Sequence, residues 1–304
     1  MRILITGGAG FIGHNLAIYL KNSGFEVGVL DSLERSTVFA VKRLSEANIP
    51  VARMSVIKTE EIKGFFKEAD VVIHAAAYVD VVESMEKPSI YFENNVLGTV
   101  SVAKASLDVG VDLLIYLSSA AVYGDPVELP IGENHPTRPI SPYGLSKLMG
   151  EEVVEFFSKY GLKQVVLRLF NVYGPGQNAA YAGVITKFLE RVRNGLPPIV
   201  YGDGEQTRDF IHVEDVAEAV KLVLKTGCVG EVLNIGSGNP IKIRDLAALV
   251  MRTYGVSGEP IYTIGRQGDI KHSYADISRA RILLGFKPRI NLENGLKRLL
   301  EGNY

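Results

Sequence analysis

The sequence lacks the features that mark several classes of protein. It contains no tryptophan and only one cysteine among 304 residues, so no internal disulfide can form. A chain without disulfides suits a reducing compartment. No apolar run approaches the roughly 18 residues of a membrane span, and Met1-Arg2 precedes a short apolar strand rather than a signal-peptide pattern. We therefore expect a soluble, cytoplasmic protein with no membrane partner.

An excess of charge of either sign is also missing. The 33 Lys and Arg residues are balanced by 34 Asp and Glu residues, which gives a formal net charge of −1. This balance gives no reason to expect a nucleic-acid partner. The five histidines show no metal-ligand spacing, and we assign no metal.

What the sequence does contain is an alternation of β-rich and helical stretches. The apolar strands resemble parallel strands that are buried on both faces. Alternation of this kind predicts an α/β fold, a Rossmann-type doubly wound parallel sheet, over residues 1–174. Glycine and proline become frequent from residue 175, so we expect a smaller C-terminal lobe over 175–304, with some segments returning to the sheet. The expected strands are Ile3–Thr6, Glu26–Leu30, Val51–Met54, Asp70–His74, Leu113–Ser118 and Gln164–Leu169, and the expected helices are Phe11–Asn22, Glu60–Lys67, Tyr91–Asp108 and Pro142–Tyr160.

Several glycines lie between the first expected strand and the first expected helix. Gly7, Gly10 and Gly13 stand where a dinucleotide fold needs a tight turn, a bare backbone and close helix–strand contact. The helix start, Phe11-Ile12, offers unpaired N–H groups to phosphates.

Asp31 ends the second expected strand, 18 residues after Gly13. A carboxylate there can bind the hydroxyls of the adenosine ribose and would repel a 2′-phosphate. The pattern predicts NAD as the cofactor, in preference to NADP.

The Gly-x2-Gly-x2-Gly spacing resembles the short-chain dehydrogenase/reductase superfamily, especially its extended branch that acts on nucleotide sugars. The superfamily's Tyr-x3-Lys pair is matched by Tyr143 and Lys147, one helical turn apart, and Ser118-Ser119 ends the preceding strand. The resemblance implies that Tyr143 is the catalytic base and that Ser119 hydrogen-bonds the substrate oxygen. Lys147 would hold the nicotinamide ribose and favour the phenolate, and Ser118 would contact the cofactor.

Other stretches resemble the extended branch along essentially the whole chain. His74-Ala75-Ala76-Ala77 resembles its cofactor-contacting loop, and Asn95-Val96-Leu97-Gly98-Thr99 resembles its asparagine motif. The resemblance assigns Ala75, Ala76 and Asn95 to the cofactor. One departure is the stretch Met54-Ser55-Val56-Ile57, where the family usually has an acidic pair that contacts adenine.

The substrate side of the resemblance begins at Phe170 and Asn171, in the segment that leads to the sugar nucleotide. Arg208 and the stretch Arg266-Gln-Gly-Asp269 resemble two clamps for a diphosphate. Guanidinium groups suit this task because they bind phosphate oxygens bidentately.

The reaction is narrowed by Ala120 and Ala121, which follow Ser119. Dehydratases of this branch carry acidic residues there, and alanine can neither donate nor accept a proton. The sequence therefore resembles the UDP-hexose 4-epimerases, which use NAD to oxidise C4 and return the hydride to the other face of a 4-keto sugar. Three alternatives stay open: a UDP-glucuronate 4-epimerase, a nucleotide-sugar reductase, and a non-catalytic NAD-sensing protein.

Two further expectations come from the same resemblance. Ser273 aligns with the position that borders the C2 substituent of the sugar, where a small residue leaves room for an acetamido group. UDP-GlcNAc and UDP-GalNAc are then expected as substrates beside UDP-glucose and UDP-galactose. The resemblance also implies a homodimer, in which the helices around Tyr91–Asp108 and Pro142–Tyr160 form a four-helix bundle.

Overall fold

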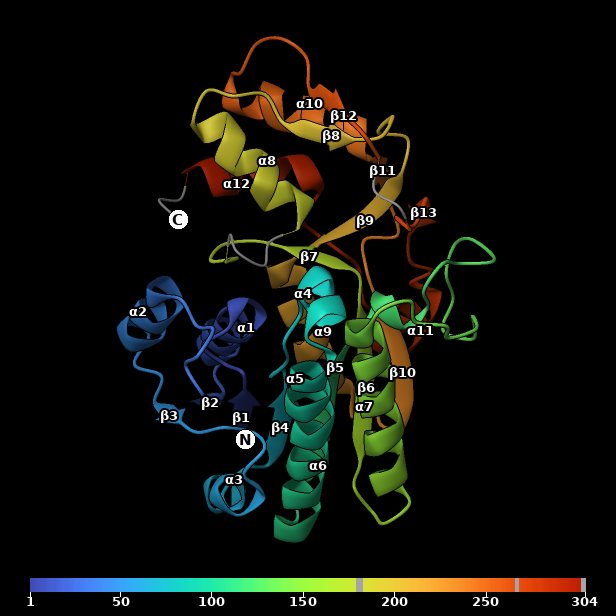
Figure 1. Ribbon diagram of the computed structural model, residues 1–304. Coiled ribbons are helices and arrows are strands. Elements are labelled where there is room, and N and C mark those ends of the chain that lie inside the picture. The colour runs from blue at the N-terminus through green and yellow to red at the C-terminus, as the bar shows by residue number, and fades with distance from the viewer. Residues whose placement is uncertain (179–182, 266–267, 302–304) are drawn as a thin grey trace.

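A seven-stranded parallel sheet forms the centre of the computed structural model, which describes residues 1–178, 183–265 and 268–301 (Figure 1). The strand order is β10-β6-β5-β4-β1-β2-β3, and every pair of neighbours is parallel. The predicted doubly wound α/β fold is confirmed. The strands are β1 (Arg2–Thr6), β2 (Glu26–Asp31), β3 (Val51–Arg53), β4 (Val71–His74), β5 (Leu113–Ser119), β6 (Gln164–Leu169) and β10 (Glu231–Ile235).

The direction of strand progression reverses at β1. The chain passes from β1 to β2 and β3 toward one edge, and then returns to place β4 on the other side of β1. In open parallel sheets, ligands bind at such a reversal, beside the carboxyl ends of the strands. We therefore expect the ligand site to be formed by the loops that follow β1, β2 and β4.

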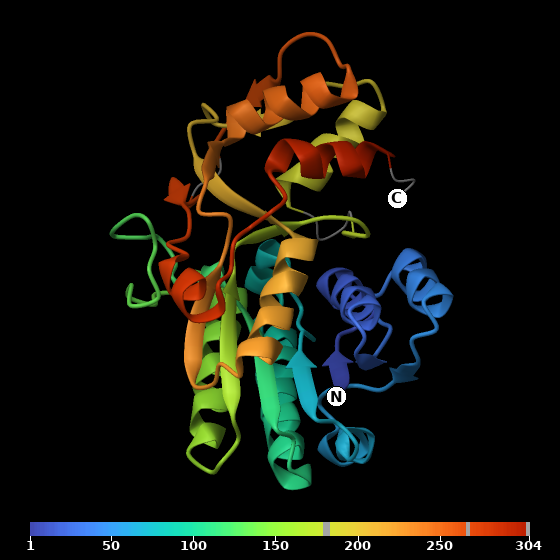
Figure 2. The ribbon, with the colours of Figure 1, turned by 180° about the vertical axis from the view of Figure 1, so that it is seen from behind.

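Helices cover both faces of the sheet, and each layer has its own apolar core. Leu16 and Val216 belong to the core on one face, whereas Val102 and Val154 belong to the core on the other. Figures 1 and 2 show these two layers from opposite sides. The first layer contains α1 (Phe11–Asn22), α2 (Val38–Glu46), α9 (Val213–Thr226) and α11 (Ser278–Leu284), and the second contains α3 (Thr59–Phe66), α6 (Gly98–Val109) and α7 (Pro142–Ser158).

The six predicted strands agree with the structure to within one residue at each end. The helix predicted over Tyr91–Asp108 is instead built from α5 (Pro88–Tyr91), a π-helix η1 (Phe92–Leu97) and α6. A change of helical pitch over six residues leaves the apolar pattern nearly unaltered, so apolar periodicity alone does not reveal the π-helix. The short helices α2 and α4 (Val81–Glu86) were not predicted.

The C-terminal part of the chain forms most of a second lobe, above the main sheet in Figure 1. Its core contains Phe188, Leu246 and Leu296. The lobe contains β7 (Asn171–Tyr173), α8 (Val184–Arg193), β8 (Ile199–Tyr201), β9 (Thr207–His212), β11 (Pro240–Lys242), α10 (Ile243–Tyr254), β12 (Ile261–Thr263), β13 (His272–Ser273) and α12 (Leu292–Glu301).

In the described part of the chain, no helix has the length and apolarity needed to cross a bilayer.

The main sheet and the lobe are joined through a very short connection. A single residue, Phe170, separates β6 in the main sheet from β7, which pairs with β9 in the lobe. Phe170 is buried, and its backbone N–H donates to the Ile235 carbonyl at 2.9 Å. In the other direction, β10 and α9 return from the C-terminal half to the main sheet.

A buried ion pair fixes α7 to the sheet. Arg168 on β6 donates to both carboxylate oxygens of Glu151, with Nε–Oε1 at 3.0 Å and Nη2–Oε2 at 2.7 Å, and the Ser118 hydroxyl donates to the same carboxylate. Beside this pair, a Cβ added to Gly150 would lie 2.1 Å from the Tyr116 hydroxyl oxygen. Only glycine at this position allows α7 to approach β5 so closely.

The ion pair generates a prediction about stability. Glu151→Gln leaves the Arg168 guanidinium buried without its counter-charge, which should lower the free energy of unfolding by about 3 kcal/mol. As a control, Glu293→Gln removes the exposed pair with Lys297 and should change it by about 0.5 kcal/mol or less. Equilibrium urea unfolding measures both. Equal, small effects would show that the Glu151 carboxylate is dispensable.

Candidate active site

A cavity of about 310 Å³ lies at the reversal point of the sheet. Its walls come from the loops after β1, β2, β3 and β4, from the end of β5 and from the start of α7. Most of the residues predicted for cofactor and chemistry gather here, although they are far apart in the sequence. Those that line the cavity are Gly7, Gly10, Phe11, Ile12, Gly13, Asp31, Ala75, Ala76, Ser118, Ser119, Tyr143 and Phe170.

The glycines are required by backbone-to-backbone contact. Gly7 has φ +66°, and a Cβ there would lie 2.5 Å from the Ala76 Cα. A Cβ on Gly13 would lie 2.2 Å from the Gly7 carbonyl oxygen. The turn after β1, the start of α1 and the loop after β4 therefore touch without intervening side chains. This cradle leaves the N-terminal end of α1, with its N-cap Gly10, open to the cavity, as binding of a pyrophosphate requires.

Asp31 is held rigidly at the same cavity. Its Oδ2 accepts the Ala9 N–H at 2.9 Å and its Oδ1 accepts the Leu33 N–H at 2.8 Å. Burial raises the pKa of the carboxyl group, and the two backbone hydrogen bonds oppose this rise. Each oxygen retains a lone pair for a further donor, so the group fits ribose hydroxyls. Met54, Ser55 and Val56 line the cavity beyond it, with no acidic side chain among them.

Ser119 and Tyr143 form the proton-handling part of the cavity. Ser141 caps α7 by accepting the Gly144 N–H at 3.1 Å, and this places Tyr143 in the first turn of the helix. Burial raises the pKa of the Tyr143 phenol, and a hydrogen bond with Ser119 partly offsets that rise. A phenol and a hydroxyl that share a hydrogen bond can hold one substrate oxygen between them.

Lys147 lies one helical turn deeper than Tyr143 and does not line the cavity. Its Nζ is 4.4 Å from the centre of the Tyr116 ring, and the side chain is buried. Burial lowers the pKa of Lys147 to about 7, although the Glu151 carboxylate opposes this shift. The amine can therefore gain or lose a proton near neutral pH.

Asn95 occupies a different place from the one its motif suggested. Asn95 is buried behind the cavity surface and does not line the cavity, whereas its neighbour Asn94 does. The Asn95 Oδ1 accepts the Tyr78 N–H at 2.8 Å, while its Nδ2 donates to the Tyr78 carbonyl at 3.0 Å and to the Ser146 Oγ at 2.9 Å. Its amide thus ties the loop after β4 to α7. Tyr78 and Arg35, which sequence reasoning missed, do line the cavity.

A second cavity, of about 620 Å³, adjoins the first and shares Val172 and Gln177 with it. Its walls come mainly from β7, α8, β8 and β9, and they include the predicted residues Asn171, Arg208 and Asp269. The Arg208 Nη2 donates to the Asp269 Oδ1 at 2.6 Å. A partly buried guanidinium on the wall of this second cavity suits a phosphorylated ligand.

Two predicted substrate residues do not lie on this lining. Ser273, on β13, is the register partner of Arg208 on β9 but lines neither cavity. Arg266 is outside the described residues.

Within the described ranges, no group of three or more His, Cys, Asp or Glu side chains is arranged to hold a metal ion.

Comparisons with known proteins identify the family to which the chain belongs. The sequence profile of the NAD dependent epimerase/dehydratase family matches residues 3–236. A putative UDP-glucose 4-epimerase of Methanocaldococcus jannaschii is 39% identical over 302 residues, which are 98% of this chain and 97% of the relative.

Two solved structures are similar over nearly their full length. The UDP-glucose 4-epimerase of Thermotoga maritima, crystallised with UDP-glucose, superposes with a TM-score of 0.93 at 36% identity, covering 99% of this chain and 98% of its own. The UDP-N-acetylglucosamine 4-epimerase of Methanobrevibacter ruminantium, in complex with UDP-N-acetylmuramic acid, gives 0.92 at 32%, covering 99% and 97%. The family profile covers most of the chain and the relatives match it nearly end to end, so the chain belongs to the NAD-dependent epimerase/dehydratase family.

Proposed function

We propose that this NAD-dependent nucleotide-sugar epimerase inverts C4 of UDP-hexoses through a 4-keto intermediate. The observation that carries the proposal is the junction of the two cavities. The first holds the cofactor cradle and the Ser119–Tyr143 pair, and the second holds Arg208. A UDP-sugar that places its diphosphate near Arg208 has its sugar ring directed toward Tyr143.

The cofactor would be held by the glycine cradle, by the N-terminal end of α1 and by Asp31. When bound, NAD supplies a hydride acceptor and the positive charge of its oxidised ring. Because Asp31 is anchored by two backbone N–H groups, its carboxylate cannot turn away from a 2′-phosphate. This favours NAD over NADP.

Ser119, Tyr143 and Lys147 would carry the proton chemistry. Ser119 positions the C4 oxygen, and Tyr143 takes the hydroxyl proton and later returns it. Because the pKa of the Tyr143 phenol is raised, the side chain stays protonated at neutral pH and little phenolate is available to accept a proton. A positive charge nearby is therefore needed to favour the phenolate. Lys147, one turn below, would supply part of that charge and bind the nicotinamide ribose.

The residues beside Ser119 favour epimerisation over elimination. Ala120 and Ala121 begin the short helix η2 (Ala120–Val122), and the Ala121 N–H donates to the Ser119 Oγ at 3.2 Å. Methyl groups at these positions provide no acid or base for removing water from the sugar. A UDP-glucuronate substrate would use the same C4 chemistry and is the main alternative.

We also propose a homodimer through α4, η1, α6 and α7. Val82 and Met85 on α4, Leu97 on η1 and Phe156 on α7 are each more than half exposed. On α7, Val154 is buried in the core beneath the helix, Val153 and Phe157 are partly buried against that core, and Phe156 is strongly exposed. The remaining exposed apolar side chains on these elements are Val81, Val100, Leu145 and Met149.

The proposed activity predicts turnover without added cofactor. Purified protein incubated with UDP-glucose should form UDP-galactose, because each cycle regenerates the NAD that it carries. Chromatographic separation of the UDP-sugars measures the product, and parallel incubations with UDP-GlcNAc and UDP-glucuronate define the substrate.

Tyr143→Phe should keep the fold and the bound NAD but lose at least about 100-fold in turnover.

Two results would contradict this proposal. Near-wild-type turnover by Tyr143→Phe would remove the assigned base. A wild type that contains no NAD and consumes NADPH in proportion to product would favour the reductase.

A second prediction concerns the sugar. Ser273 lines neither cavity, but its register partner Arg208 lines the second, so the larger side chain in Ser273→Tyr would extend beside Arg208 toward the substrate. The phenol ring would collide with an acetamido group, which should depress epimerisation of UDP-GlcNAc by at least about 10-fold and spare UDP-glucose. Ser273→Ala is the matched control and should leave both reactions unchanged. Equal losses on the two substrates in Ser273→Tyr, or no acetamido activity in the wild type, would refute the role of Ser273.

A third prediction concerns assembly. Sedimentation velocity at micromolar concentration should show a dimer, and Leu97→Glu should dissociate it because a buried, unpaired carboxylate is costly. Ile282→Glu is the control, since Ile282 is exposed on α11, outside this face. A monomeric wild type would exclude the dimer.

A further inference from the structure

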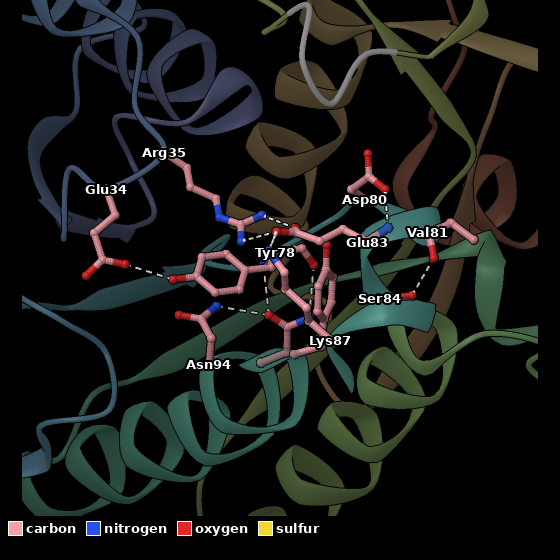
Figure 3. Close-up of polar contacts among 11 residues, drawn as sticks. Glu34, Arg35, Tyr78, Asp80, Val81, Glu83, Ser84, Lys87 and Asn94 are labelled. Atoms are coloured by element: carbon pink, nitrogen blue, oxygen red, sulfur yellow. Dashed lines mark hydrogen bonds and ion pairs between the residues drawn. The ribbon is translucent and has the colours of Figure 1, made fainter. Parts of the chain in front are cut away.

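A cluster of side chains crosses the mouth of the cofactor cavity. Arg35, in the loop after β2, donates from Nη1 to the Glu83 Oε2 at 2.6 Å and from Nη2 to the Glu83 Oε1 at 3.1 Å. Glu83 lies on α4, on the other side of the cavity. Figure 3 shows the guanidinium between Glu83 and the Tyr78 ring, whose centre is 3.6 Å from the Arg35 Cζ.

A second connection runs beside the first in the same direction. Tyr78, in the loop after β4, donates its hydroxyl to the Glu34 Oε2 at 2.8 Å (Figure 3). The loop after β2 is therefore joined to the loop after β4 by the Arg35–Tyr78 cation–π contact and by the Tyr78–Glu34 hydrogen bond. The Arg35–Glu83 ion pair joins it to α4. Both side chains of the cation–π contact also line the cavity.

The topology makes these contacts a crossing. β2 and β4 are the two neighbours of β1 in the sheet, and the glycine turn that cradles the cofactor follows β1. Side chains that join the loops after β2 and β4 therefore span the end of β1, and Arg35 and Tyr78 line the same cavity as Gly7 and Gly10. A dinucleotide bound on the turn would lie next to the contact between Arg35 and Tyr78.

The side of the crossing that bears Glu83 and Tyr78 is anchored. Asp80 caps α4 by accepting the Glu83 N–H at 2.7 Å, which orients the helix turn that bears Glu83 (Figure 3). The Tyr91 hydroxyl donates to the Glu83 Oε2 at 2.9 Å. Asn95 holds the Tyr78 backbone through both its N–H and its carbonyl. The side chains that meet across the cavity are therefore held in place by the wall and by α4.

We propose that Arg35, Tyr78 and Glu83 form a strap over the bound NAD and that this strap sets the rate at which the cofactor dissociates. The Arg35 and Glu83 side chains are 23% and 21% exposed, so their attraction is less screened than that of a surface pair. A catalyst that regenerates its cofactor in every cycle benefits from slow release. The strap concerns NAD binding alone and does not depend on which sugar is epimerised.

The test measures exchange of bound NAD in the holoprotein. Purified protein is mixed with excess isotope-labelled NAD, and the bound fraction is followed by mass spectrometry. Arg35→Met and Glu83→Gln should each speed exchange by about 10-fold, the scale of one lost charge-assisted pair. The double variant should be no faster than either single one, because both remove the same interaction.

Two controls separate the strap from a general loss of stability. Arg279→Met removes a partly exposed ion pair with Glu231 on the far side of the main sheet and should leave NAD exchange unchanged. Exchange in the wild type should accelerate with ionic strength more steeply than in Glu83→Gln, since salt screens the pair that the variant lacks. A merely structural role would lower the melting temperature without altering this salt dependence.

Wild-type exchange rates in Arg35→Met and Glu83→Gln would overturn the proposal. If these variants do not fold, Tyr78→Phe still decides the matter. It keeps the ring against Arg35 and removes the hydroxyl with its hydrogen bonds to Glu34 and Arg35, so a smaller acceleration of exchange is expected. An unchanged rate in that variant would also overturn the strap, whether or not the protein epimerises UDP-hexoses.

Discussion

The contact of α7 with β5 and β6 is the constraint on which the rest of the site depends. Gly150 lets the helix backbone approach Tyr116, and Glu151 receives Arg168 from the sheet. An apolar contact would tolerate a small slide of the helix, whereas a slide here would leave two buried charges unpaired. The same position of α7 on the sheet places Tyr143 beside Ser119 and buries the Lys147 side chain one helical turn further along.

The two cavities rely on different parts of the chain. The cofactor cradle is made largely by backbone, because the glycine turn and the loop after β4 meet without side chains. The second cavity is lined mainly by residues of the lobe, among which Arg208 is paired with Asp269. A wall made of backbone keeps its shape when side chains are substituted, whereas a cavity lined by side chains changes shape and polarity with the sequence.

The sequence was informative wherever a short stretch carries its own physical requirement. The glycines after β1, the acid at the end of β2 and the Tyr143–Lys147 spacing are local patterns, and the structure brings the glycines, Asp31 and Tyr143 to one cavity. The π-helix and the wall position of Asn95 depend on packing around them. The Arg35–Glu83 pair joins residues 48 positions apart, and each alone resembles an ordinary surface charge. Such pairs become visible only when the fold brings the two loops together.

The one-residue connection at Phe170 has a consequence for how the lobe and the main sheet can move relative to each other. With β6 in the main sheet and β7 in the lobe, a single residue links two paired strands. A displacement of the lobe at β7 would therefore be transmitted directly to β6 and, through the pairing of β6 with β5, to the strand that ends at Ser119.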